Sequence, residues 1–130
     1  MTLAAVLALP ALQHSRPELL AGDPESRIVR WVHSSEIYDI AALLRGGELL
    51  LTTGLGLERS TTDERRQYVR SLADKGVAGL ALELSGSFSQ VPADMVDEAR
   101  RLGLPFVALR DVYPFVEVTE QVNSAILDLS

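Results

Sequence analysis

Cysteine is absent from the sequence, and Lys75 is its only lysine. Without cysteine the chain can form no disulfide, no thiolate nucleophile and no cysteine-ligated metal site, a composition that fits a reducing cytosol. Positive charge is also scarce, because 12 Lys and Arg face 18 Asp and Glu and the formal net charge is -6. Non-specific nucleic-acid binding needs clustered cations, so we expect no direct nucleic-acid contact by this chain.

Long apolar runs are missing as well. No stretch approaches the roughly twenty apolar residues that a membrane-spanning helix needs. The apolar start, MTLAAVLALPALQ, lacks the Lys or Arg that opens a secretion signal, and Pro10 interrupts it. We therefore expect a short amphipathic helix there that packs on the domain, and a cytoplasmic protein without membrane contact.

The composition is nevertheless that of a folded protein. Hydrophobic residues make up 47% of the 130 positions, which is enough for the core of one domain. No linker, repeat or low-complexity tract divides the chain. We expect residues 1–130 to form a single domain.

Strand and helix signals alternate from Glu48 onward. The apolar run 48–52 predicts a strand that is covered on both faces. Thr61 and Glu64 form a capping box at the start of a helix, and Gly76 has the place of a left-handed C-cap. The later elements are a strand over 77–84, a helix from Pro92 to Gly103, a strand over 105–109 and a helix after Pro114.

This alternation predicts an α/β fold, because a crossover helix returns the chain to the same edge of a parallel sheet. Two further strands are expected over 17–22 and 27–35, followed by a short helix over 37–44. The predicted fold is a mostly parallel, possibly mixed, sheet flanked by helices, with a C-terminal helix.

Small and polar residues follow the predicted strands. Thr52, Thr53 and Gly54 come after the first, Ser85 follows the second, and Arg110 follows the third. Ligands of open parallel sheets bind beyond the carboxyl ends of the strands, so these residues predict a shared pocket for a small polar molecule. The alternative is that they are ordinary turn residues.

Gly46 and Gly47 precede the strand that begins at Glu48. A glycine pair after a helix is first a C-cap and turn, and only second a place where a ligand approaches the backbone. Glu48 could accept hydrogen bonds from the free amides of this turn or pair with Arg45.

His33 and Glu36 are three residues apart, a spacing that could bind a metal on a helix. His33, however, falls at the end of a predicted strand, and His14 is the only other histidine, so we expect neither metal nor cofactor. His33 would form a local hydrogen bond or contact an effector. Glu36 would precede a helix capped by a serine. Trp31 would anchor the core or the domain edge, and a platform on which a ligand stacks is the alternative.

Catalytic motifs are not found. The stretch GLGLERS has Arg59 where a dinucleotide-binding loop needs its third glycine, and neither a Walker loop nor a nucleophile elbow is present. Asp94 and Glu98 are four apart on a predicted helix, where a solvated acidic face is the expected arrangement. We predict that the chain is not an enzyme.

The final helix carries apolar residues at alternating steps of three and four, the spacing of a coiled-coil seam. It could pack on the sheet, form a dimer contact or lead as a rod into a following segment. The seam consists of Phe115, Val118, Val122, Ala125 and Leu129.

The stretch VRWVHSSEIYDIAALLRGGELLLTTGLGL, residues 29–57, resembles the N-terminal domain of PucR-type purine-catabolism regulators. Trp-Val-His, a nearby Ser-Glu and the string GGELLLTTG occur there in this order. The segments GVAGLALEL and LPFVALRDVYPFVEVTEQVNSAI resemble the same family. One departure is Ile40-Ala41, which stands where a proline-containing pair is expected.

The resemblance implies an effector-sensing module of a longer transcriptional regulator, whose DNA-binding part lies towards the C-terminus and which controls purine or other nitrogen catabolism. The effector would be a small polar metabolite, and a homodimer is expected by analogy with regulators that bind paired half-sites. A dimerisation or docking module without a ligand is the alternative. The ligand-binding residues expected on all these grounds are His33, Glu36, Gly46, Gly47, Glu48, Thr52, Thr53, Gly54, Ser85 and Arg110.

Overall fold

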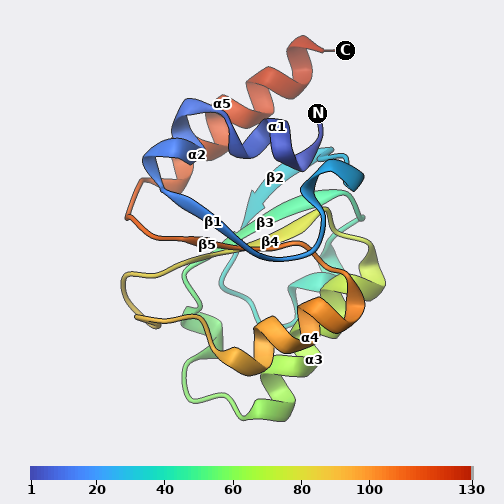
Figure 1. Ribbon diagram of the computed structural model, residues 1–130, viewed down its shortest axis with the longest axis vertical. Helices are drawn as coiled ribbons and strands as arrows, with labels where there is room; N and C mark the ends of the chain where they lie inside the picture. Colours follow the sequence, from blue (N-terminus) through green and yellow to red (C-terminus); the bar gives the residue numbers. More distant parts are fainter. Residues whose placement is uncertain (130) are drawn as a thin grey trace.

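The computed structural model describes residues 1–129, which form a five-stranded sheet with the strand order β1-β5-β4-β3-β2 (Figure 1). Strands β2, β3, β4 and β5 are parallel, whereas β1 pairs with β5 in the antiparallel sense. The predicted α/β domain with a mixed, mostly parallel sheet is therefore confirmed. The strands are β1 (Pro17–Ala21), β2 (Trp31–Ser34), β3 (Glu48–Thr52), β4 (Gly79–Glu83) and β5 (Phe106–Leu109).

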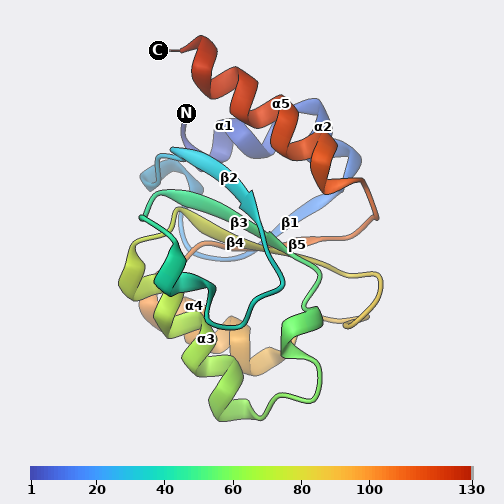
Figure 2. The ribbon, with the colours of Figure 1, turned by 180° about the vertical axis from the view of Figure 1, so that it is seen from behind.

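Helices cover both faces of the sheet, as the two opposite views show (Figures 1 and 2). Three core-forming segments pack on one face: α3 (Thr62–Lys75), α4 (Ala93–Leu102) and the 3-10 helix η2 (Ile40–Leu43). The other face carries α1 (Leu3–Leu7), α2 (Pro10–His14) and α5 (Phe115–Asp128). Two more 3-10 helices are η1 (Pro24–Ser26) and η3 (Leu55–Leu57). All residues of β3, β4 and β5 are buried, which explains their continuous apolar sequences.

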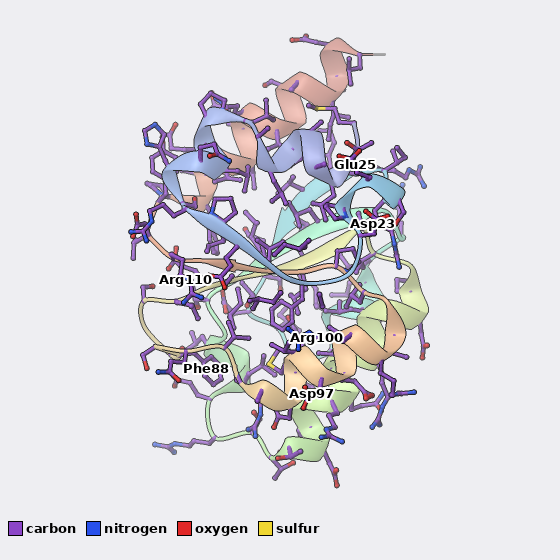
Figure 3. All side chains as sticks on the ribbon, in the orientation of Figure 1. Asp23, Glu25, Phe88, Asp97, Arg100 and Arg110 are labelled. Carbon is purple, nitrogen blue, oxygen red and sulfur yellow. The ribbon has the colours of Figure 1, made fainter. Side chains whose placement is uncertain are left out.

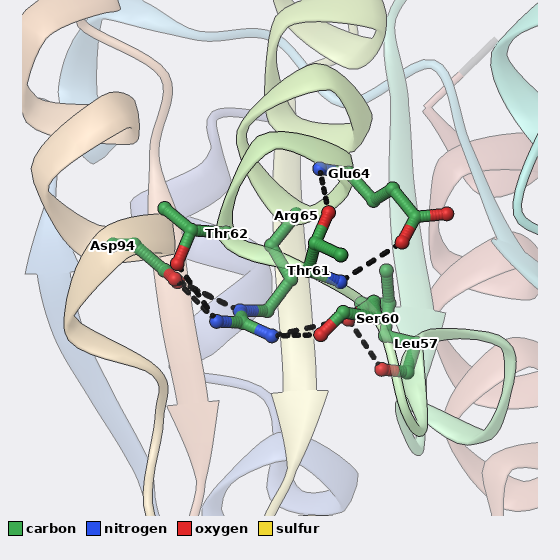
Figure 4. A network of polar contacts seen from close by, with 7 residues as sticks. All are labelled: Leu57, Ser60, Thr61, Thr62, Glu64, Arg65 and Asp94. Atoms are coloured by element: carbon green, nitrogen blue, oxygen red, sulfur yellow. Dashed lines mark hydrogen bonds and ion pairs between the residues drawn. The ribbon is translucent and has the colours of Figure 1, made fainter.

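The predicted capping box is present at the start of α3 (Figure 4). The Thr61 hydroxyl accepts from the Glu64 amide at 3.1 Å, and the Glu64 carboxylate accepts from the Thr61 amide at 2.9 Å. The following residue, Arg65, donates to Asp94 at the start of α4, with its Nη2 2.6 Å from Oδ2. This bidentate ion pair fixes α3 against α4.

The final helix, α5, packs on the sheet, which is one of the three arrangements that its apolar spacing allows. Val118 and Val122 are 0% exposed, because they pack on the sheet beneath α5. These two side chains are not available to a second copy, so a dimer seam through them is wrong. Phe115 also packs on this core, whereas Leu129 is 67% exposed.

Two smaller expectations also need correction. The helix expected over 37–44 is a single 3-10 turn, because only Ile40, Ala41 and Leu44 of this stretch are buried and they do not form the continuous apolar face of a longer helix. Pro10 divides the N-terminal segment into two short helices, since proline begins a helix but cannot continue one. No helix within residues 1–129 is long and apolar enough to cross a membrane.

Candidate functional site

A pocket of ≈ 640 Å³ lies beside the edge strand β2. Its other wall is the segment that connects β2 to β3, residues 35–47, which we call the β2–β3 connection. Figure 2 shows this connection leaving the tip of β2 and running below the sheet beside α3. We call the hollow the β2 pocket; it is lined by Arg30, Trp31, His33, Ser34, Ser35, Ile37, Ile40, Leu43, Leu44, Arg45, Gly46 and Glu48.

The β2 pocket has an apolar wall and a polar rim. Trp31, Ile37 and Leu43 are 42%, 54% and 71% exposed, although such large apolar side chains usually lie inside a protein. Trp31 is therefore not a core residue, as one sequence interpretation had it, but part of the pocket wall at the domain edge. Arginines, serines and His33 provide hydrogen-bonding groups around this apolar surface.

The Glu36 carboxylate holds the first part of the β2–β3 connection against the end of β3. It accepts hydrogen bonds from the Thr52 hydroxyl at 2.8 Å, the Thr53 amide at 2.9 Å and the Leu55 amide at 3.1 Å. The expected helix N-terminus at Glu36 is wrong, because this carboxylate instead satisfies the free amides beyond β3.

Glu48 holds the last part of the connection in a similar way. Its two carboxylate oxygens accept from the amides of Arg45 and Gly46, at 2.7 and 2.8 Å. Gly46 and Gly47 have φ values of +99° and +84°, which favour glycine, and together they turn the chain into β3. The structural role expected for this Gly-Gly-Glu turn is therefore confirmed, with the amides of Arg45 and Gly46 as its donors.

Gly56 is required for the same arrangement. A side chain at this position would collide with the carbonyl oxygen of Glu36. The hydroxyl of Tyr38 also donates to the Glu64 carbonyl of α3, at 2.6 Å. The connection is thus attached to β3 at both of its ends and to α3 at its middle, so the protein's own hydrogen bonds hold this wall of the β2 pocket in place.

The pocket expected at the ends of β3 and β4 is filled by the protein itself. Thr52 is 2% exposed and bonded to Glu36, and a side chain on Gly54 would meet the Phe88 ring at 2.6 Å. Tyr68, 3% exposed, lies in the same region, where burial raises the pKa of its phenol. Thr52 and Thr53 therefore position Glu36, and the Gly54 amide donates to the Thr52 hydroxyl at 3.1 Å. None of the three lines the β2 pocket.

Two further predicted residues lie elsewhere. The Ser85 hydroxyl donates to the Glu83 carboxylate at 2.6 Å. Arg110 binds Glu18 on β1, at the sheet edge opposite β2 (Figure 3). The expectation of one shared hollow is wrong, since only His33, Gly46 and Glu48 among the ten predicted residues line the β2 pocket, with Glu36 and Gly47 in support.

The sequence interpretation missed the arginines and the apolar wall. Their location was nevertheless signalled, because every lining residue from Arg30 to Glu48 falls within the quoted motif, residues 29–57. The motif therefore encodes one pocket and its two carboxylate anchors. Within residues 1–129, no group of three or more His, Asp or Glu side chains is arranged to hold a metal ion.

Comparisons with known proteins confirm the resemblance to PucR-type regulators. Residues 5–126 match the model of the purine catabolism regulatory protein-like family, PucR. The chain is 31% identical over 99 residues to the transcriptional activator PmfR of Paenarthrobacter nicotinovorans, covering 76% of this chain and 21% of that protein. It is 25% identical over 130 residues to the purine catabolism regulatory protein of Bacillus subtilis, covering 99% of this chain and 24% of that protein.

One relative bears the name of a transcriptional activator and the other that of a regulatory protein, and the chain spans about a quarter or less of their length. The family match covers nearly all of the described fold, including both walls of the β2 pocket. The chain therefore belongs to the purine catabolism regulatory protein-like family.

Proposed function

We propose that this chain is the effector-sensing part of a longer transcriptional regulator of purine or other nitrogen catabolism, and that the β2 pocket binds the effector, a small metabolite. The observation that carries this proposal is the pocket itself. Its volume of ≈ 640 Å³ lies within the range of small-molecule sites, roughly 300–1,000 Å³. Apolar walls with a few polar groups are also typical of such sites.

A path by which an occupied pocket could affect the rest of the regulator begins at β2. One face of this strand lines the pocket through Trp31 and His33. Its backbone is bonded to α5, because the Asn123 side chain accepts from the Val32 amide at 2.8 Å and donates to the Val32 carbonyl at 3.2 Å. A ligand would shift α5 only if it binds two positions of β2 with different affinity.

The test is a thermal-shift screen with purine catabolites, amino acids and related nitrogen compounds, followed by titration of every compound that raises the melting temperature. We expect a stabilising compound whose effect is lost in His33→Ala and Leu43→Ser. Matched controls are His14→Ala on α2 and Leu127→Ser on α5, which do not line the β2 pocket. If no compound raises the melting temperature, or if the control variants lose the stabilising effect equally, the sensing proposal loses its support.

A docking role without a ligand is the second candidate, favoured by the exposed Trp31, Ile37 and Leu43 on one wall. Exposed apolar surface of this kind marks interaction sites as well as ligand sites. Sedimentation velocity over a range of concentrations separates the two functions. A dimer that dissociates in Leu43→Ser but not in Leu127→Ser, and that ignores all metabolites, would establish docking.

A further inference from the structure

We propose, on the basis of the function above, that the β2 pocket selects a flat anion: a small conjugated ring that carries a carboxylate or an equivalent negative group. The charges around the pocket carry this inference. The chain as a whole is acidic, with a formal charge of -6, yet the pocket is lined by Arg30 and Arg45 and by a single carboxylate, Glu48.

Glu48 does not neutralise these arginines. It is 8% exposed, and both of its oxygens already accept backbone amides, at 2.7 and 2.8 Å. Within residues 1–129, neither the Arg30 nor the Arg45 guanidinium forms an ion pair or a hydrogen bond. Elsewhere in the fold, carboxylates bind Arg65, Arg70, Arg101 and Arg110. The pocket thus holds two arginines whose guanidinium groups no carboxylate of the described residues neutralises, a state that Arg59, Arg66 and Lys75 share elsewhere in the fold.

Both arginines extend from fixed backbone. The Arg30 amide donates to the Gly47 carbonyl at 2.8 Å, and the Arg30 stem lies across Gly47, where an added side chain would meet its Cδ at 2.6 Å. The Arg45 amide is held by Glu48. Because the backbone at both positions is already held, only the arginine side chains have to become ordered when a ligand binds.

The shape of the ligand follows from the remaining wall. Guanidinium groups are planar and bind carboxylates through two parallel hydrogen bonds. Trp31 offers a ring for stacking, and Ile37, Ile40 and Leu43 provide aliphatic surface. A flat body against Trp31 with its negative end at the arginines satisfies both parts of the pocket.

The experiment uses pairs of probes that differ in charge but little in shape. These are benzoate against benzamide, and purine-6-carboxylate against purine-6-carboxamide; cyclohexanecarboxylate is the anion without a flat ring. Trp31 is the only tryptophan, so its fluorescence reports occupancy of the pocket, and two-dimensional amide NMR locates the binding site. We expect each aromatic carboxylate to bind about tenfold more tightly than its amide.

Arginine variants test the source of that preference. Arg30→Gln and Arg45→Gln should each weaken carboxylate binding about tenfold and leave amide binding unchanged. Arg59→Gln is the matched control, since Arg59 is exposed but does not line the pocket. Added salt should weaken carboxylate binding alone, because the pocket is open to solvent.

The results that would contradict the charge preference, the flat shape and the proposed function differ from one another. Amides that bind as tightly as carboxylates, or a screened metabolite that binds while no carboxylate does, would overturn the charge preference and leave the sensing function standing. Equal weakening by Arg59→Gln would show general surface attraction and overturn it too. Binding of cyclohexanecarboxylate as tightly as benzoate would refute the flat shape. A pocket that binds neither the probes nor any screened metabolite would refute both the inference and the proposed function.

Discussion

Among single side chains, Glu36 has the clearest effect on the shape of the site. Three donors at the end of β3 point at its carboxylate, whereas Glu48 holds the other end of the β2–β3 connection. The residue therefore acts by positioning the β2–β3 connection, and not by touching a ligand.

We predict that Glu36→Ala lowers the free energy of unfolding by about 2 kcal/mol, because the Thr53 and Leu55 amides lose a charged acceptor. Glu36→Gln keeps one acceptor oxygen and should lose about half as much. Urea denaturation measures both, with Glu58→Ala as the exposed control. Equal stability of Glu36→Ala and Glu58→Ala would disprove the anchoring role.

Gly56 provides an independent test of the same contact. Gly56→Ala should lower stability by about 1–3 kcal/mol, since the new methyl group collides with the Glu36 carbonyl. Gly86→Ala is the matched substitution, because nothing lies within 4 Å of the position where its methyl group would be. Thermal melting of both variants checks this, and similar melting temperatures would count against the close approach.

Between elements, ion pairs from Arg65 and Arg70 of α3 to two largely buried carboxylates of α4, Asp94 and Glu98, join the two helices. Glu98 is 4% exposed and accepts from Arg70 and Arg101, each at 2.8 Å. The solvated acidic face expected for Asp94 and Glu98 is wrong, because both carboxylates face arginines. Hydrogen bonds from Arg101 and then Arg70 lower the pKa of Glu98 from 4.5 to about 2.

This pKa predicts a loss of stability in acid. A carboxyl group whose pKa is lower in the folded state stabilises the fold above its unfolded pKa of 4.5, and the contribution is lost as the pH falls towards about 2. Glu98→Gln should therefore be less stable than the unaltered chain near neutral pH, with the difference shrinking in acid. Urea unfolding from about pH 6 to about pH 2 measures it. The exposed neighbour variant Asp97→Asn should show no such convergence.

The contact between α5 and β2 is a second junction of elements. Asn123 satisfies both the amide and the carbonyl of Val32 on an edge strand. We predict that Asn123→Ala lowers stability by about 1–2 kcal/mol and speeds hydrogen exchange at the Val32 amide. Asn123→Asp cannot donate to the Val32 carbonyl and should be no more stable than Asn123→Ala. The exposed Ser124→Ala should leave the stability unchanged. Unchanged exchange at Val32 in both Asn123 variants would contradict this.

At the scale of the whole molecule, the last helix, α5, is part of the hydrophobic core. Val122→Asp should prevent stable folding, with a loss above about 3 kcal/mol, because it places an unpaired charge at a fully buried position. Leu129→Asp, at the exposed residue that caps the end of the same helix, should keep the fold. Circular dichroism melting checks both variants. A folded Val122→Asp chain that only dissociates from a dimer would revive the seam.

The sequence predicted the strands and α3 well because their signals are local. Apolar runs, the Thr61–Glu64 capping box and Gly76 act within a few residues, so no knowledge of the tertiary fold is needed. The family resemblance drew attention to the segment 29–57 that holds the pocket.

The location of the pocket was not predictable in the same way. Thr52 and Gly54 have the composition of a ligand loop, but Glu36, sixteen residues earlier, occupies the donors of this loop in space. When a side chain so distant in the sequence accepts the hydrogen bonds of a loop, the residues of the loop itself carry no pattern that reveals it. Ile37 and Leu43 fit a helical pattern, yet both side chains remain exposed beside β2.

In the β2–β3 connection, the apolar side chains that line the pocket are different from the side chains that hold the backbone in place. Ile37 and Leu43 shape one wall of the pocket while more than half of each side chain faces solvent, so replacing them removes little buried surface. Two carboxylates and a tyrosine hold the backbone of the connection, whatever those two side chains are. Mutant libraries confined to these two positions would thus change ligand preference at little cost in solubility or expression, which makes this fold a practical starting point for engineered biosensors.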